Sequence, residues 1–208
     1  MGRLPHLKVL ELERLDTLEY VENTSTATSS PHPTPSNPIA TASAPNPLFL
    51  SLEQLILKDM PKLKGWRKII CTSSTSTSSG EEEAQVLQNC GHYYVFPTLK
   101  RLEFYSMGLE VVPEEFRDLS ALESLVLSNC DELKELQEWI DTLTFLKQLS
   151  IDACPKLKSL PKQIANLSNL ERLRIKDCPI LKERCKEPTG KDCPLIQHVP
   201  HVVLTGLG

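Results

Sequence analysis

One phrase recurs near the C-terminal end of the chain with a period of 24 residues. Residues 119–134 read LSALESLVLSNCDELK, residues 143–158 read LTFLKQLSIDACPKLK, and residues 167–182 read LSNLERLRIKDCPILK. The pattern L-x-x-L-x-L, or a close variant of it, begins at residues 7, 52, 99, 122, 146 and 170. The last four copies are therefore 23 or 24 residues apart, while the first two intervals hold one period plus an insertion. A fixed period of this length predicts a repeat architecture.

Each copy predicts one short strand with one buried face, because apolar and polar residues alternate with the two-residue period of a β-strand. A single unit cannot bury that face, whereas units stacked along a parallel sheet can. The period lies in the range of leucine-rich repeats. We therefore expect an α/β repeat fold, a horseshoe-shaped leucine-rich-repeat solenoid with a parallel sheet on its concave face and short helices and coil on its convex face.

We expect one domain over residues 1–208 with about six repeats. The insertions at 23–47 and 71–95 contain too few apolar residues for a core and are expected to be flexible loops, and 179–208 is expected to be a C-terminal cap and tail. The expected strands are 8–12, 53–57, 100–104, 123–127, 147–151 and 171–175, with most helix near 113–119, 137–143 and 161–167. The expected core layers contain Leu125, Leu127, Leu149, Ile151, Leu173 and Ile175.

Composition narrows the class of protein. The chain is 40% apolar and 24% charged with a formal net charge of −4, which is typical of a soluble globular protein and gives no bulk attraction to nucleic acid. No apolar run reaches the length of a membrane span, and the N-terminus lacks the features of a secretory signal. The odd number of cysteines, seven, favours reduced thiols and a cytoplasmic location.

The motifs of catalysis are missing from the sequence. It contains no phosphate-binding loop, no G-x-S-x-G and no H-E-x-x-H, so we expect neither an enzyme nor a cofactor. Cys90 and His92 could form a nucleophile pair, but no orienting acid accompanies them. Cys130, Cys154 and Cys178 occupy one position of the repeat and indicate either a metal site or, as we favour, small buried apolar residues. We expect no metal.

The outward positions of the strands are the candidate binding residues, because period-2 alternation turns them away from the core. The first row, with Glu11 and Glu13, is acidic, and the row of the last expected strand is basic. That basic row indicates either a docking site for an acidic partner or a solvated strand face whose charges protect a sheet edge. The candidate partner-binding residues are Glu11, Glu13, Arg101, Glu103, Tyr105, Arg172, Arg174 and Lys176.

The C-terminal sequence CPKLKSLPKQIANLSNLERLRIKDCPILKERCKEPTGKDCPLIQHVPHVVL, residues 154–204, resembles the end of plant nucleotide-binding leucine-rich-repeat immune receptors of the coiled-coil class. The matching features are C-P-x-L-K, the L-P-x-x-I-x-x-L-x-x-L link and the closing R-C-K-E-P-T-G-K-D with I-x-H-V-P. The resemblance implies recognition of a pathogen effector or a guarded host protein, and restraint of a nucleotide-binding domain. Since that domain and the coiled coil are absent, it implies the tail of a longer receptor or a truncated relative.

Three other classes of protein share such repeats. A free-standing intracellular signalling scaffold is the main alternative, although its repeats usually run without insertions. A ubiquitin-ligase adaptor would need a helical box, for which there is no room before Leu7. An extracellular receptor would carry a signal peptide and the repeat L-x-G-x-I-P, and neither is present.

Overall fold

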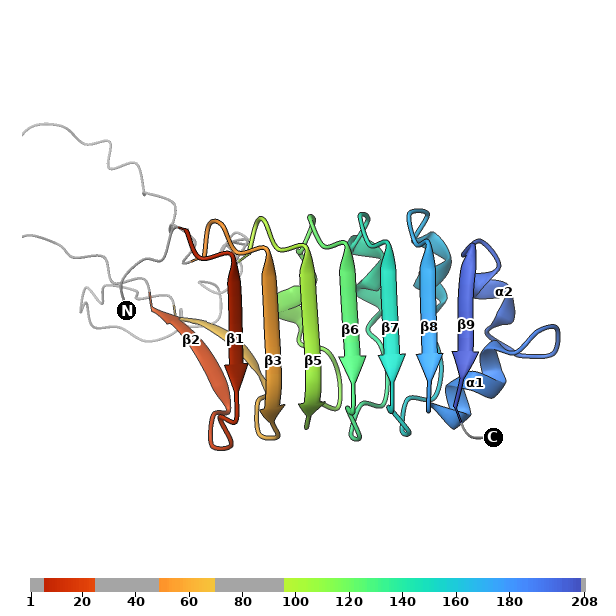
Figure 1. Cartoon of the computed structure of the whole chain (residues 1–208), viewed down its shortest axis with the longest axis horizontal. Helices are drawn as coiled ribbons and strands as arrows, with labels where there is room; N and C mark the ends of the chain where they lie inside the picture. The colour runs from red at the N-terminus through yellow and green to blue at the C-terminus, as the bar shows by residue number, and fades with distance from the viewer. Residues whose placement is uncertain (1–5, 25–48, 70–95, 207–208) are drawn as a thin grey trace, which may run out of the picture.

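A computed structural model of the chain describes residues 6–24, 49–69 and 96–206. Its main element is a seven-stranded sheet in the order β1-β3-β5-β6-β7-β8-β9, in which every neighbouring pair is parallel (Figure 1). The strands are β1 (Val9–Glu13), β3 (Gln54–Met60), β5 (Arg101–Met107), β6 (Ser124–Ser128), β7 (Gln148–Asp152), β8 (Arg172–Lys176) and β9 (His201–Thr205). The expected leucine-rich-repeat solenoid is confirmed. Most of both expected insertions, and the pair Cys90 and His92, lie outside the described residues.

Six of these strands were expected from the repeat, but each begins one residue later than predicted. The reason lies in the turn before the strand. The carbonyl of Lys100, for example, accepts hydrogen bonds from the N–H groups of both Glu123 and Ser124, so Glu123 closes the turn and Ser124 opens β6. Strands β3 and β5 also continue to Met60 and Met107, beyond their expected ends.

Three strands were not expected. β9 extends the main sheet beyond β8, within the segment predicted only as a cap and tail. β2 (Tyr20–Thr24) and β4 (Gly65–Ile69) form a separate parallel pair at the N-terminal end. None of the three carries the L-x-L signature, which is why the repeat pattern missed them.

The core consists of matching layers of inward-facing side chains. Leu125, Leu127, Leu149, Ile151, Leu173 and Ile175 are each at most 1% exposed, as predicted. At the N-terminal end aromatic rings join these layers. Phe104 meets Phe116 edge-on with ring centroids 5.6 Å apart, and Phe96 stacks between Phe49 and Phe116.

From β3 to β8, a sharp turn at the end of each strand places a sulfur atom in the core. One residue per repeat has a positive φ, such as Asn129 at 54° and Asp177 at 50°, and these are mostly short polar residues that tolerate that region. The next residue enters the core, which stacks Met60, Met107, Cys130, Cys154 and Cys178 in one column. In the last turn Gly206 has φ 111°, and a Cβ there would lie 2.6 Å from the Asp177 nitrogen.

The convex side carries the expected helical turns, and they are 3-10 helices. They are η2 (Glu114–Phe116), η3 (Glu138–Thr142) and η4 (Lys162–Asn166). Each buries one apolar side chain, Phe116, Ile140 or Ile164. Proline precedes η2 and η4, where its fixed φ and missing N–H suit a helix start.

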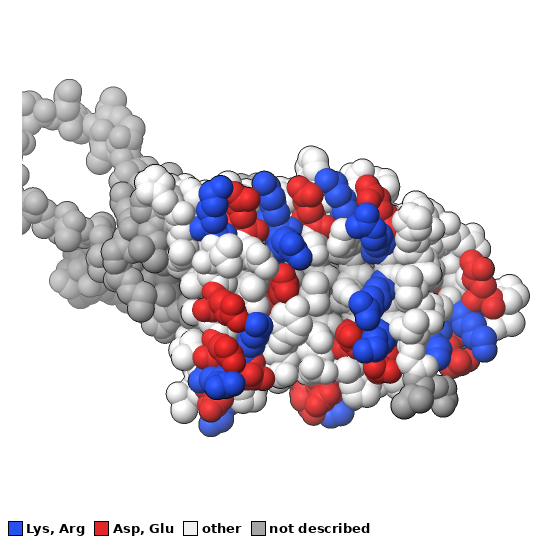
Figure 2. Space-filling model, viewed as in Figure 1, with Lys and Arg blue, Asp and Glu red and all other residues white. Residues whose placement is uncertain are grey.

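Acidic and basic residues alternate along the edge at which the strands begin (Figure 2). The residues just before the six successive strands are Lys8, Glu53, Lys100, Glu123, Lys147 and Glu171. Ion pairs of 3.1 Å, 3.4 Å and 2.9 Å join Lys8 to Glu53, Lys100 to Glu53, and Lys147 to Glu123. Each exposed ion pair adds at most about 1 kcal/mol to the stability of the fold. The alternation also keeps like charges from lying side by side on neighbouring repeats.

Candidate protein-interaction surface

The sheet has one face against the core and one face turned to solvent. The solvent face, which corresponds to the predicted concave face of the solenoid, is called the outer face below. All eight predicted binding residues lie on it, on β1, β5 and β8. Alternation fixes this arrangement. On β8, Leu173 and Ile175 are buried, so Arg172, Arg174 and Lys176 point the other way. β1 and β8 are separated by four strands, so the acidic and basic rows do not meet.

Glu103 is the centre of a hydrogen-bonded cluster on β3 and β5. Its side chain is largely buried, with the residue 8% exposed. One carboxylate oxygen accepts from Gln54 Nε2 at 2.8 Å, and the other accepts from the Tyr105 hydroxyl at 2.8 Å. Arg101 Nε lies 3.7 Å from the first of these oxygens. The buried charge is therefore fully partnered within the chain.

Lys58 connects this cluster to the acidic row of β1. Its Nζ donates to Glu11 at 2.5 Å and lies 5.6 Å from the centre of the Tyr105 ring. The bond to Glu11 raises the pKa of Lys58. Glu13 pairs with Arg14 at 3.2 Å. On the N-terminal half of the outer face, the charged side chains thus pair with one another.

Partial burial and the bond to Glu103 raise the pKa of Tyr105 to about 12. The phenol therefore stays neutral at physiological pH and keeps donating to the carboxylate. Sequence alternation places Gln54 and Lys58 on this face, but it does not show that they bind Glu103 and Glu11. That pairing depends on the register between strands.

The C-terminal half of the outer face is different. Within the part of the chain that the structure describes, Arg172 and Arg174 form no ion pair, and both are exposed. The Lys176 Nζ lies 3.8 Å from a carboxylate oxygen of Asp152 and 3.5 Å from one of Asp177, so the charge of Lys176 is partly compensated. On the neighbouring strand β7, the small residue Ser150 lies opposite Arg174, and Gln148 lies opposite Arg172.

The edge-protection interpretation of this basic row is wrong. It required the row to lie on the last strand, but β8 lies between β7 and β9. The true edge strand, β9, carries no Lys, Arg, Asp, Glu or Pro between His201 and Thr205. The sequence clue to it was the apolar run Val202–Leu204, which the L-x-L search passed over.

Two of the cations that follow the basic row, Lys182 and Arg184, do not extend it. Arg184 pairs with the buried Asp192, and Lys182 Nζ donates to the Gly206 carbonyl at 2.8 Å. These contacts fasten helix α1 (Pro179–Cys185) to helix α2 (Cys193–Ile196) and to the end of β9. Lys182 and Arg184 therefore stabilise the C-terminal cap and are not part of the basic row on β8.

The repeated cysteines are buried thiols. Cys130, Cys154 and Cys178 are at most 1% exposed, and each Sγ donates to the carbonyl of the residue two positions earlier. The adjacent thiols of Cys130 and Cys178, with burial, raise the pKa of Cys154. Among the described residues no group of three or more His, Cys, Asp or Glu is placed to hold a metal.

His198 and His201, close in sequence, have separate roles. The Nε2 of His198 is 3.1 Å from the Leu167 carbonyl, while His201 opens β9. No helix in the described part of the chain has both the length and the apolar character needed to cross a bilayer.

No model of a protein family matches the sequence, and no curated protein matches it. Among solved structures, the chain is similar to the leucine-rich repeat domain of the type III effector XCV3220 (XopL), with 20% identity and a TM-score of 0.46. The match covers 75% of this chain and 54% of that chain, so it spans about half of the other chain.

Proposed function

We propose that the chain is a non-enzymatic protein-recognition module whose partner presents an acidic surface to Arg172 and Arg174. One observation carries this proposal. These two guanidinium groups are exposed on an internal strand and have no ion-pair partner among the described residues, whereas Lys58 and Glu103 on the same face are paired.

The energetics of the pair support a docking role. Residues two apart on one strand face are about 7 Å apart, so the two charges repel by about 0.6 kcal/mol in water. The solenoid tolerates this cost, and an acidic partner would replace the repulsion with attraction. Guanidinium groups bind carboxylates through two parallel hydrogen bonds, which gives such a contact orientation as well as strength.

The paired N-terminal half of the outer face has a supporting role in this proposal. Its network holds Tyr105 and Glu103 in fixed positions and leaves little unmet charge to attract a partner. Recognition is therefore concentrated on β8 and its neighbours. Electrostatic contacts of this kind set partner choice and association rate more than total affinity.

The sequence resemblance supports a finer proposal. The chain would be the recognition region of a cytoplasmic plant immune receptor, sensing a pathogen effector or a guarded host protein and restraining the receptor's nucleotide-binding domain. The transcript tests this directly. A phosphate-binding-loop domain in frame upstream of Met1 would support the receptor, whereas an in-frame stop codon without such a domain would favour the free-standing signalling scaffold.

Affinity capture from plant-cell extract tests the recognition site. The baits are the wild-type chain, a variant with Arg172, Arg174 and Lys176 changed to Glu, and a control with Lys158, Lys162 and Lys186 changed to Glu. The control has the same change in net charge, but its three exposed lysines lie outside the sheet.

We expect the wild type and the control to retain a common acidic protein that the β8 variant loses, with retention falling as salt is raised. Thermal unfolding must show that all three baits are folded at the temperature of the capture, because no core residue changes. An identical set of retained proteins for all three would contradict the proposal.

A further inference from the structure

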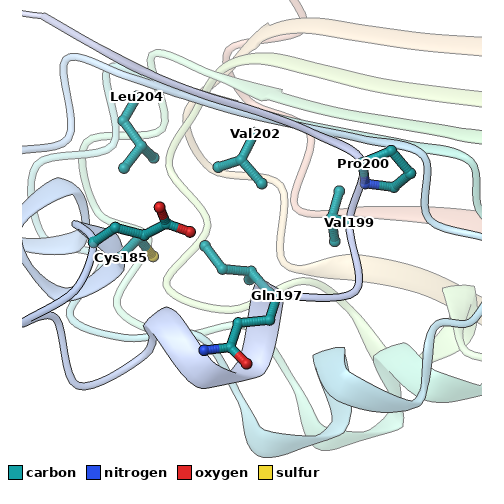
Figure 3. A pocket seen from close by; sticks show the side chains of 8 residues that line it. Cys185, Gln197, Val199, Pro200, Val202 and Leu204 are labelled. Atoms are coloured by element: carbon teal, nitrogen blue, oxygen red, sulfur yellow. The ribbon is translucent and has the colours of Figure 1, made fainter.

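Within the described part of the chain, the inward-facing residues of the last strand, β9, are less covered than those of the strands before it. On β7 and β8 the inward side chains are at most 1% exposed, but on β9 Val202 is 37% exposed and Leu204 is only partly buried. Below them is an open hollow of about 440 Å³ (Figure 3). Its lining is mixed: it includes the apolar side chains of Ile196, Val199, Val202 and Leu204 and the polar side chains of Glu187 and Gln197.

The backbone of β9 also faces this edge. The His201 N–H donates to Glu171 on the β8 side, and the Thr205 carbonyl accepts from Asp177 on the same side. In a parallel strand both polar groups of one residue point to the same neighbour, and successive residues alternate. Val202 and Leu204 therefore turn their N–H and C=O groups toward the open edge, where the described residues provide no further strand.

The charges nearby determine what kind of strand this edge would accept. A strand added to β9 would lie two strand spacings, about 9.6 Å, from β8. Its outward side chains would face Arg174 across the small side chain of Val203, and Arg172 across His201. Acidic side chains at these positions would complement the two unpaired guanidinium groups, while the inward side chains of the added strand would lie against Val202 and Leu204 at the top of the hollow.

We propose that β9 binds an extended segment of a partner protein as an eighth strand, and that this segment alternates acidic and apolar residues. The apolar side chains cover Val202 and Leu204, the acidic ones meet Arg172 and Arg174, and the backbone pairs with β9. This rests on the proposed function, because the acidic side chains act at the basic pair described above. Strand addition of this type derives affinity from backbone bonds and specificity from alternate side chains.

Synthetic peptides with blocked ends test the pattern on the full chain. The probe is Glu-Leu-Glu-Val-Glu-Leu-Glu. One control replaces every Glu by Lys, and a second replaces every apolar residue by Ser. A third control carries N-methyl groups on alternate amides. It is made in two versions, one with the odd-numbered amides methylated and one with the even-numbered amides methylated. We expect saturable binding of the probe and at least tenfold weaker binding of the Lys and Ser peptides and of one N-methylated version.

Variants of the chain test the site. Val202→Pro removes an N–H that faces the open edge and leaves the pairing with β8 intact, whereas Val9→Pro, on β1 at the opposite edge of the sheet, is the matched proline control. We expect at least tenfold weaker binding for Val202→Pro and for the Arg172→Glu/Arg174→Glu double variant, and a change of less than about twofold for Val9→Pro.

The outcomes separate this inference from the proposed function. If Val202→Pro and both N-methylated peptides bind normally, or if the probe does not bind, strand addition is overturned. Loss of the acidic protein on reversal of Arg172 and Arg174 would still leave the proposed function standing. The β1 sequence VLELE has the same alternation. If the full chain self-associates and Val202→Pro abolishes this association, the strand that binds β9 comes from a second copy of the chain. That result would overturn the proposal of a separate partner protein.

Discussion

Arg184 and Asp192 form a two-point ion pair that fastens the C-terminal cap to the solenoid. The Arg184 Nε and Nη2 donate to the two carboxylate oxygens at 2.9 Å and 2.7 Å. Asp192 is 3% exposed and also accepts the Leu160 N–H at 3.0 Å, which reaches back to the repeat that contains β7. One buried carboxylate therefore connects α1, the start of α2 and the repeat stack.

Replacing Asp192 by Ala should lower the free energy of unfolding by about 2–3 kcal/mol. The change leaves the Leu160 N–H without its partner and a half-buried guanidinium unpaired. Urea unfolding measures the loss. Glu132→Ala is the matched control, because its pair with Lys156 is exposed on both sides and should contribute less than about 1 kcal/mol. Equal losses for the two variants would show that Asp192 does not fasten the cap.

Leu149→Ala should lower the free energy of unfolding by about 2–5 kcal/mol. Leu149 is 1% exposed, so the removed atoms leave a cavity in its core layer. Each repeat contacts only its neighbours, so the damage should reach the repeats of β6 and β8 before that of β1. Native-state hydrogen exchange on the variant measures this spread. Uniform loss of protection across all strands would count against a stack of nearest-neighbour repeats.

Tyr105 should titrate near pH 12 rather than near 10. Burial and the bond to Glu103 favour the neutral phenol, so its pKa is raised from 10.0 to about 12. The stability that this bond contributes is present below pH 10 and is lost as the pH rises through about 12. The tyrosinate absorbance of the wild type minus that of Tyr105→Phe isolates this group. A midpoint near 10 in the difference curve would mean that the bond is not formed.

Cys185 should react slowly with maleimide in the folded chain. Burial, and secondarily the charge of Asp192, raise the pKa of this thiol to about 12, so almost no thiolate is present at neutral pH. Mass mapping of the labelled peptides measures the rate, and the chain unfolded in guanidinium provides the reference. Labelling as fast in the folded as in the unfolded chain would contradict the burial of Cys185.

The repeat made most of the fold predictable. Alternation of Leu with polar residues placed Leu149 and Ile151 in the core and Arg172 and Arg174 on the outer face, because strand geometry alone decides which side a residue takes. The positions of Cys130, Cys154 and Cys178 in one column follow from the same period. None of these inferences needs knowledge of which side chains touch.

The unpredicted features depend on contacts between distant residues. Glu103 could be placed on the outer face, but its partner Gln54 is 49 residues away and is brought near only by the register of β3 and β5. Strand β9 escaped the pattern because Val202–Leu204 lacks the L-x-L form and follows a helical cap. Missing it also produced the wrong interpretation of β8 as an edge.

The most direct test of the account is a charge swap between Arg174 and the acidic residue that faces it in the captured partner. We predict that Arg174→Glu weakens binding at least tenfold, that changing the partner's acid to Lys does the same, and that the two changes together restore most of the affinity. Losses that simply add in the double variant, or unchanged binding in either single variant, would contradict recognition through the unpaired arginines of β8.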